Sequence, residues 1–265
     1  PIVNLTFSHD SKLLISQDKD RTVHWWDLLT GNKIENRDNF DIASKDLTLR
    51  EQTNLPVSPS PCLLVSPNHS TIVPSHRNYG DRLEKLEKSI DSINNFALSV
   101  DDRILATSND NNKICLWDLV TGERLKILEG HPEAIESLAF STDGEILATA
   151  SKDKTVKLWD VVTGKYIKTL VGHQHWVSGV VFSPDGKAIA TSSWDKTVRL
   201  WDLASGCQQQ IFFGHKGCVR SISFSPDGSL LVSGGFDKKI FLWDVASGKQ
   251  IRTIRAYRDI LNVSF

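Results

Sequence analysis

The sequence predicts an all-β chain built from tandem four-stranded antiparallel sheets. The first observation behind this prediction is a repeat of 42 residues, marked by the pairs Trp117-Asp118, Trp159-Asp160, Trp201-Asp202 and Trp243-Asp244. The second is a set of turn sequences that keep the same phase, SPDG or STDG before three of these pairs and Thr-Gly or Ser-Gly after all four. The third is that the short segments between these turns are rich in apolar and β-branched residues, which favours strands.

Each repeat is expected to contain four strands. IESLAFS, VSGVVFS and VRSISFS come first, EILATAS, KAIATSS and SLLVSGG second, and TVKLWD, TVRLWD and KIFLWD third. Glycine is fourth in the SPDG turns, as a type I turn prefers, and the glycine after Trp-Asp allows the positive φ of a hairpin turn. The fourth segments, such as RLKILEG and QIRTIRA, alternate charged and apolar residues, which is typical of an outermost strand.

We expect one domain over residues 1–265. Its repeats fall at about 1–37, 38–88, 89–130, 131–172, 173–214 and 215–256, with 257–265 as the first strand of a further blade. The second repeat is degenerate, because Ser75-His76 stands where the others have Trp-Asp, and an extended loop over residues 38–61 leads into it. The chain begins with proline and contains no methionine, so we expect it to be a segment of a longer protein.

Gly-His pairs precede successive repeats at Gly130-His131, Gly172-His173 and Gly214-His215. With the Trp-Asp pairs, these landmarks resemble the WD-repeat family over nearly the whole chain, and they are specific in four of six repeats. The resemblance implies a β-propeller, in which blades form a ring. Either the six visible repeats close the ring or, as is more usual in the family, a seventh blade completes it. Tandem repeats this similar also resemble bacterial multidomain proteins in which the propeller is fused to a signalling or ATP-binding effector.

The resemblance also implies a hydrogen-bonded network in each regular repeat, from the indole through a hydroxyl and an imidazole to a carboxylate. The matching sets are His131, Thr149, Asp153, Trp159; His173, Thr191, Asp195, Trp201; and His215, Ser233, Asp237, Trp243. Histidine, aspartate and a hydroxyl also suggest nucleophilic catalysis. The same set of residues occurs three times, each time at the same place in the repeat, whereas an active site is normally a single set. We therefore favour a structural role and expect no catalytic residues. In the repeat that contains Trp117, Ser89 and Asn111 replace the histidine and the aspartate. We expect this blade to be less stable, because its loops lose an internal tether.

Propellers of this family generally bind partners on the face that carries the Gly-His segments and the turns between second and third strands, here called the GH face. By resemblance, the candidate partner-binding residues on this face are Glu136, Lys152, Trp176, Ser178, Trp194, Arg220 and Phe236. Tryptophan and arginine often anchor interfaces, and such a patch suits a peptide with apolar and acidic residues. The alternative interpretation is that Trp176 and Trp194 only pack on each other within one blade.

Composition excludes several other classes of function. Lys and Arg number 31 against 32 acidic residues without long runs of either sign, so we expect neither nucleic acid nor membrane as a partner. Four scattered cysteines favour neither a disulfide framework nor a thiolate metal site, and His173 with His175 is too small a set for a metal. We expect no cofactor and a cytoplasmic location, since no apolar segment is long enough to span a bilayer.

The leading hypothesis is a non-catalytic scaffold or sensor module that binds a protein or peptide on the GH face, with a role in signalling. One alternative is a small-ligand or enzymatic propeller with a site at the central channel, which shifted ionisable groups near the axis would favour. Another is a module that packs against other domains of the same longer chain and regulates an effector domain. Exposed apolar surface on the outer rim would favour that alternative.

Overall fold

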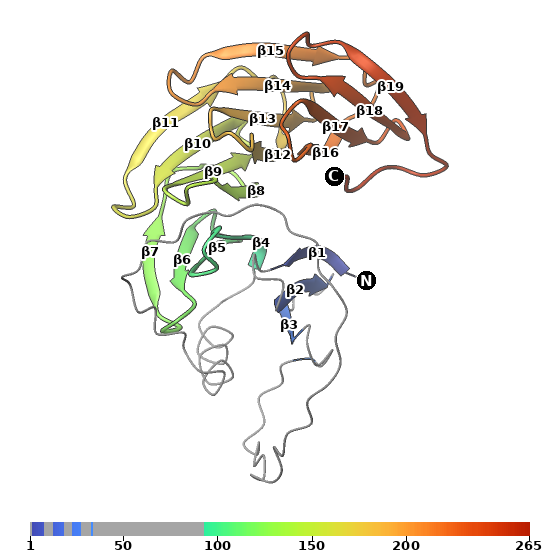
Figure 1. Cartoon of the computed structure of the whole chain (residues 1–265). Coiled ribbons are helices and arrows are strands. Elements are labelled where there is room, and N and C mark those ends of the chain that lie inside the picture. Colours follow the sequence, from blue (N-terminus) through green and yellow to red (C-terminus); the bar gives the residue numbers. More distant parts are fainter. Residues whose placement is uncertain (1, 8–12, 19–22, 28–32, 34–92) are drawn as a thin grey trace, which may run out of the picture.

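The structure is a computed structural model that describes residues 2–7, 13–18, 23–27, 33 and 93–265. These ranges form strands and turns and contain no helix (Figure 1). The degenerate second repeat, with its inserted loop, lies outside the described residues.

Four antiparallel four-stranded sheets, here called blades, follow one another between residues 93 and 255. In each blade the strand order is sequential, so every strand pairs with its neighbour in the chain. The first two blades are β4 (Ile93–Leu98), β5 (Ile104–Asn109), β6 (Ile114–Asp118), β7 (Arg124–Leu128), and β8 (Ile135–Phe140), β9 (Ile146–Ser151), β10 (Thr155–Asp160), β11 (Tyr166–Val171). The next two are β12 (Val177–Phe182), β13 (Ala188–Ser193), β14 (Thr197–Asp202), β15 (Gln208–Phe213), and β16 (Val219–Phe224), β17 (Leu230–Gly235), β18 (Lys239–Asp244), β19 (Gln250–Arg255).

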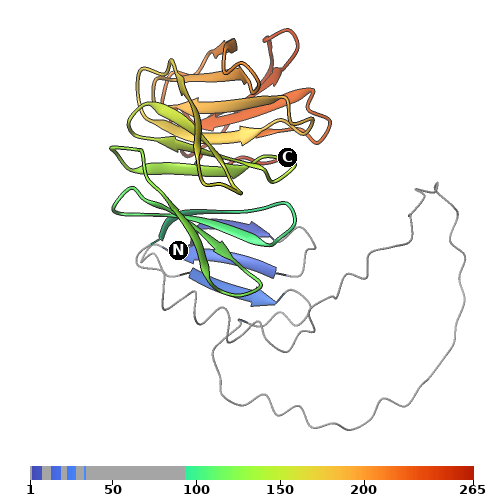
Figure 2. The same cartoon turned by 90° about the vertical axis from the view of Figure 1, so that its left-hand side faces the viewer.

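The N-terminal repeat forms a smaller sheet. Its strands are β1 (Ile2–Phe7), β2 (Leu13–Asp18) and β3 (Val23–Asp27), and Trp26 forms an isolated bridge with Lys33. Figures 1 and 2 show the blades stacked side by side, with β8, β12 and β16 toward the centre and β11, β15 and β19 on the outside. The prediction of an all-β chain with four-stranded antiparallel blades is therefore confirmed for the four repeats between residues 93 and 255.

The turns between strands follow from the repeated sequences. In the turn after β12, the amide of Gly186 donates to the carbonyl of Ser183 at 2.9 Å, and Gly186 has a φ of 69°. The Asp185 carboxylate accepts from the Ser183 hydroxyl at 2.6 Å, which fixes the turn further. After β14, the amide of Gly206 donates to the Asp202 carbonyl and Gly206 has a φ of 75°, a conformation that glycine adopts without strain.

The core lies between blades rather than within one. Val156, Leu158 and Leu170 of blade β8–β11 pack with Ile189 and Trp201 of blade β12–β15 in a single buried cluster. Each blade therefore depends on its neighbour to bury one of its faces, as expected for stacked repeats.

On the outward face of blade β16–β19, which has no such neighbour among the described residues, an apolar side chain is exposed. Leu128, Leu170 and Phe212 occupy equivalent places on β7, β11 and β15, and each is at most 2% exposed. Ile254, at the same place on β19, is 52% exposed. In the described part of the chain, no further blade covers this face.

Residues 257–265 were expected to form the first strand of a further blade, and this prediction is wrong in that they form no strand. They lie along the preceding blade instead: the Ile260 amide donates to the Gly235 carbonyl at 3.1 Å, and the Val263 amide donates to the Ser221 hydroxyl at 3.1 Å. A strand is defined by its ladder with a neighbour, and among the described residues no segment pairs with this one.

Candidate functional site

The structure brings together each predicted set of histidine, hydroxyl, aspartate and tryptophan. In blade β12–β15, Trp201 Nε1 donates to Thr191 Oγ1 at 2.9 Å, and Thr191 Oγ1 lies 2.7 Å from His173 Nε2. His173 Nδ1 lies 2.7 Å from the carboxylate of Asp195. The set of His131, Thr149, Asp153 and Trp159 has the same geometry, with distances of 2.7 to 3.0 Å. In the set of His215, Ser233, Asp237 and Trp243, serine replaces threonine and the distances are 2.8 to 3.0 Å.

Burial and hydrogen bonding determine the charge states of the network in blade β12–β15. Burial lowers the pKa of His173 below its usual 6.5, although the Asp195 carboxylate opposes this shift, so His173 is neutral at pH 7. Burial alone would raise the pKa of Asp195, but hydrogen bonds from His173 and Thr197 outweigh it and hold that pKa far below its usual value. An ionised Asp195 only accepts hydrogen bonds, so His173 Nδ1 carries the proton and Nε2 accepts from Thr191.

These networks hold the Gly-His segments against their blades. The Asp195 carboxylate also accepts from the Gln174 amide at 3.0 Å, and the Asp237 carboxylate accepts from the Lys216 amide at 2.8 Å. The side chains of His131, His173 and His215 are at most 1% exposed. The arrangement can therefore order the loops of the GH face.

The irregular repeats keep only part of the network. In blade β4–β7, Trp117 Nε1 donates to Thr107 Oγ1 at 2.9 Å, and Asn109 Oδ1 accepts from the amides of Asn111 and Lys113 in place of an aspartate at position 111. Ser89 lies outside the described residues. In the N-terminal sheet, Trp26 Nε1 donates to Ser16 Oγ at 2.8 Å, a pair that the sequence analysis did not single out.

An aromatic cluster lies on the GH face, formed by His175, Trp176, Trp194 and Phe236. The Trp176 and Trp194 ring centroids are 4.6 Å apart, and the Trp194 and Phe236 centroids are 5.9 Å apart. His175 stacks on Trp194 at 5.8 Å, and its Nδ1 accepts from the Trp176 amide at 2.8 Å. The two tryptophans do pack on each other, but both remain half-buried and Phe236 is 37% exposed. The cluster thus combines internal packing with a surface that a partner can contact.

A charged group adjoins the aromatic cluster and spans three blades. Lys152 Nζ lies 3.3 Å from Glu136 Oε1 and 4.6 Å from the centroid of the Trp176 ring. Arg220 Nη1 lies 3.8 Å from Glu136 Oε2 and donates to the Ser178 carbonyl at 3.3 Å. The family resemblance placed these residues on one face but could not reveal the pairing, because contacts between side chains of different blades leave no pattern within a single repeat.

The expectation that Ser178 is exposed on the GH face is wrong. Ser178 is 2% exposed, and its hydroxyl donates to the Val219 carbonyl of the next innermost strand at 2.5 Å. A small residue here lets β12 and β16 approach closely, and the arginine side chain of β16 passes over it. The remaining predicted residues, Glu136, Lys152, Trp176, Trp194, Arg220 and Phe236, form one continuous group through the contacts given above.

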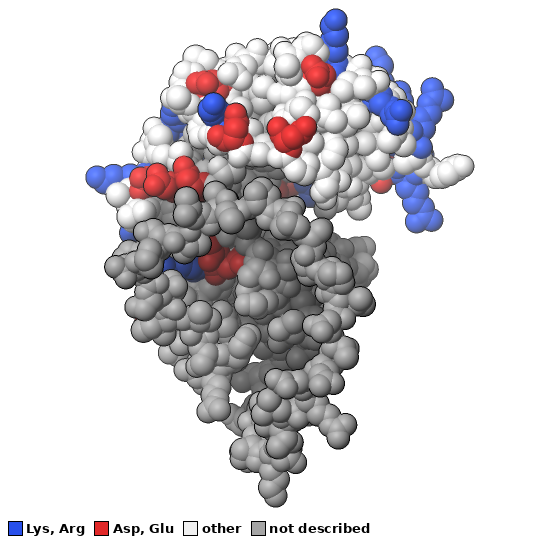
Figure 3. Space-filling model, viewed as in Figure 1, with Lys and Arg blue, Asp and Glu red and all other residues white. Residues whose placement is uncertain are grey.

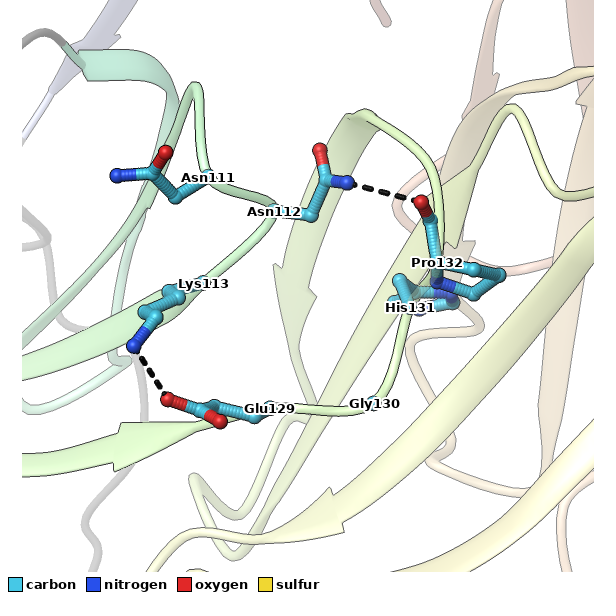
Figure 4. Close-up of a pocket in the computed structure, with 7 residues that line it drawn as sticks. All are labelled: Asn111, Asn112, Lys113, Glu129, Gly130, His131 and Pro132. Atoms are coloured by element: carbon cyan, nitrogen blue, oxygen red, sulfur yellow. Dashed lines mark hydrogen bonds and ion pairs between the residues drawn. The ribbon is translucent and has the colours of Figure 1, made fainter.

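A separate open depression of about 520 Å³ lies between blades β4–β7 and β8–β11 (Figure 4). Lys113 and Glu129 on its wall pair with each other at 2.6 Å, and Asn112 Nδ2 donates to the Pro132 carbonyl at 3.0 Å. These two contacts join polar groups of the wall to one another.

The distribution of charge over the blades is mixed. Figure 3 shows acidic and basic side chains interspersed, with Lys and Arg concentrated toward the side of β19, where Arg252 and Arg255 are exposed. Across the described ranges no three His, Cys, Asp or Glu side chains gather as a metal site would require. The same ranges include no helix with the length and apolar character needed to cross a membrane.

Comparison with known families identifies the repeats. The family model for the WD domain, G-beta repeat, matches residues 1–27, 81–118, 122–160, 164–202 and 206–244, which is more than half of the chain. Comparison with curated proteins gives no match. The matched segments end at the Trp-Asp pairs and include blades with the tryptophan-to-hydroxyl bonds described above, and the chain therefore belongs to the WD40 repeat family.

Proposed function

We propose that this chain is a non-catalytic scaffold or sensor module that binds a protein or peptide on its GH face, with a role in signalling. WD40 repeat domains generally serve as protein-interaction scaffolds. The observation that carries the proposal is the continuous group of partly exposed aromatic and charged side chains from Glu136 to Phe236. Aromatic residues and arginine dominate the energetics of many interfaces, and here they are supported by rigid blades.

The buried networks support a non-catalytic role. One constellation of histidine, aspartate and hydroxyl recurs in three successive blades with its imidazoles enclosed. Each hydroxyl is already engaged by a tryptophan indole, which occupies the atom that a nucleophilic mechanism would require. A structural role accounts for both the repetition and the burial.

A pull-down with the intact protein tests the binding face. Trp176→Ala, Trp194→Ala and Arg220→Ala are expected to weaken capture of the partner. Val162→Ala is the matched control, because Val162 is 75% exposed in the turn between β10 and β11, at the opposite edge of its blade. Capture that is equal for all four variants would remove the GH face from consideration.

A second candidate function is packing against another domain of a longer chain through the outer rim. Apolar side chains are exposed along the outermost strands: Leu125 and Ile127 on β7, Ile167 and Val171 on β11, and Phe213 on β15. Val171 and Phe213 are 71% and 70% exposed, and a row of such residues is costly to leave in water. Val171→Ser and Phe213→Ser should then release a neighbouring domain, seen as new protease sensitivity in the intact protein, without affecting partner capture on the GH face.

We also propose that the blades belong to a ring-shaped propeller of six repeats that a further, seventh blade completes. The uncovered Ile254 on β19 supports this, since its counterparts on the other outermost strands are enclosed by the next blade. A blade docked there would restore the same burial. Protection of the β19 amides from hydrogen exchange in the intact protein, at the level of the β15 amides, is the expected result, whereas faster exchange in β19 would contradict it.

A further inference from the structure

The second residues of three successive innermost strands meet on the GH face. They are Glu136 on β8, Ser178 on β12 and Arg220 on β16. Because Ser178 is small and buried, the Arg220 guanidinium extends over β12, where it donates to the Ser178 carbonyl and comes within 3.8 Å of Glu136. Lys152 approaches the same carboxylate from the turn between β9 and β10, at 3.3 Å. One carboxylate therefore lies between two cations from different blades.

The hydrogen-bonding capacity of this group is unbalanced. A guanidinium offers five N–H donors and an ammonium three, and neither accepts. Among the described residues, the acceptors that these two cations contact are the Glu136 carboxylate and the Ser178 carbonyl. The ion-pair distances of 3.3 and 3.8 Å exceed the roughly 2.7–2.9 Å of a tight charge-assisted hydrogen bond. The group therefore carries a net positive charge and holds its own carboxylate loosely.

Water and a partner can reach all three charged side chains. Arg220, Lys152 and Glu136 are 34%, 32% and 22% exposed at their side chains. The Lys152 ammonium also lies over the Trp176 ring, so the cationic group and the aromatic cluster share one surface. An anion that enters beside the Lys152 ammonium is thus next to the tryptophans, and an apolar neighbour of that anion can contact the aromatic rings.

We propose that the GH face recognises a carboxylate side chain of a protein partner, which replaces Glu136 between Lys152 and Arg220 while an adjacent apolar residue packs on Trp176 and Trp194. Glu136 is then an internal competitor that sets specificity: it keeps the two cations oriented in the free protein and rejects neutral or basic peptides. This inference rests on the proposed function, since it names the chemistry of the partner at the same face.

The test uses a random heptapeptide display library selected against the intact chain and its variants. The wild type should enrich peptides with Asp or Glu near an aromatic or aliphatic residue. Glu136→Gln should raise the affinity for a selected acidic peptide by about two- to fivefold, as removal of a partly exposed competing charge predicts. Glu145→Gln is the matched control, because it makes the same substitution at an exposed carboxylate at the opposite edge of the blade. Lys152→Ala combined with Arg220→Ala should abolish the acidic preference but retain the apolar one.

The outcomes separate the two proposals. Peptides that depend on Trp176 and Trp194 but show no acidic preference, or an affinity for acidic peptides that Glu136→Gln leaves unchanged, would overturn this inference alone. Selection of no peptide that depends on the two tryptophans would overturn the proposed function and this inference together. Thermal unfolding of each variant shows whether a lost preference reflects a lost fold, and the gain expected for Glu136→Gln cannot arise from unfolding.

Discussion

Arg220 Nη1 lies 3.8 Å from Glu136 Oε2, although the two residues belong to blades that are separated by a third. The buried Ser178 on the intervening strand makes this approach sterically open. The pair connects three repeats with similar backbones into one surface with its own charge pattern. In the function proposed here, specificity comes from the few positions where the repeats differ, while their shared residues supply the scaffold.

The hydroxyl at the centre of each network should be essential, but the methyl group beside it should not. Thr191→Val leaves the Trp201 indole and His173 Nε2 without their shared buried partner, and we expect a loss of about 1–3 kcal/mol in the free energy of unfolding. Thr191→Ser should be much closer to the wild type, because Ser233 makes the same two contacts in blade β16–β19. Urea denaturation measures the free energy of unfolding of both variants. Equal losses for the two variants would show that packing of the methyl group, rather than the hydrogen bonds, matters at this position.

The networks also predict loss of stability in acid. The pKa of His173 and that of His215 are lowered by burial, so the unfolded chain takes up protons first as the pH falls below the usual histidine value of 6.5. The pKa of Asp195 and that of Asp237 are lowered because hydrogen bonds outweigh burial, so their contribution is present above the usual aspartate value of 3.8 and is lost as the pH falls below it. In both cases the unfolded state binds more protons, so stability rises with pH through these windows.

We therefore expect the free energy of unfolding to decrease steadily from pH 7 to pH 3, as measured by urea denaturation at each pH. His173→Gln should reduce the slope between pH 7 and pH 5, since it removes one group that titrates there. A free energy of unfolding that increases on acidification over this range would contradict the assigned charge states.

Packing between blades predicts unequal effects at equivalent positions of the outermost strands. Leu170→Ala empties a site that is 2% exposed, and we expect it to cost about 2–5 kcal/mol. Ile254→Ala alters the same place on β19, where half of the side chain is exposed, and should cost only about 1 kcal/mol in this chain. Thermal and urea unfolding of the two variants provide the comparison. Similar losses would mean that the outward face of blade β16–β19 is covered.

The strands and turns of the regular repeats could be predicted because they recur with the 42-residue period, and the resemblance to the WD-repeat family implied the buried networks. A hydroxyl that recurs at one position of the regular repeats, as at Thr149, Thr191 and Ser233, is expected to serve the blade itself. The period could not show that Ser178 is buried, because the distance between neighbouring innermost strands depends on how blades stack. Nor could it predict that residues 257–265 form no strand, since a strand-like sequence forms a ladder only beside another strand.

The aromatic cluster of the GH face is the surface that we propose binds the partner. The most direct measurement is the affinity of the captured partner, by isothermal titration calorimetry, for the wild type, for Trp176→Ala combined with Trp194→Ala, and for the control Val162→Ala. Loss of two interface anchors should cost at least about 2 kcal/mol, so the double variant is expected to bind about 30-fold more weakly while the control binds like the wild type. A folded double variant with unchanged affinity would contradict the claim.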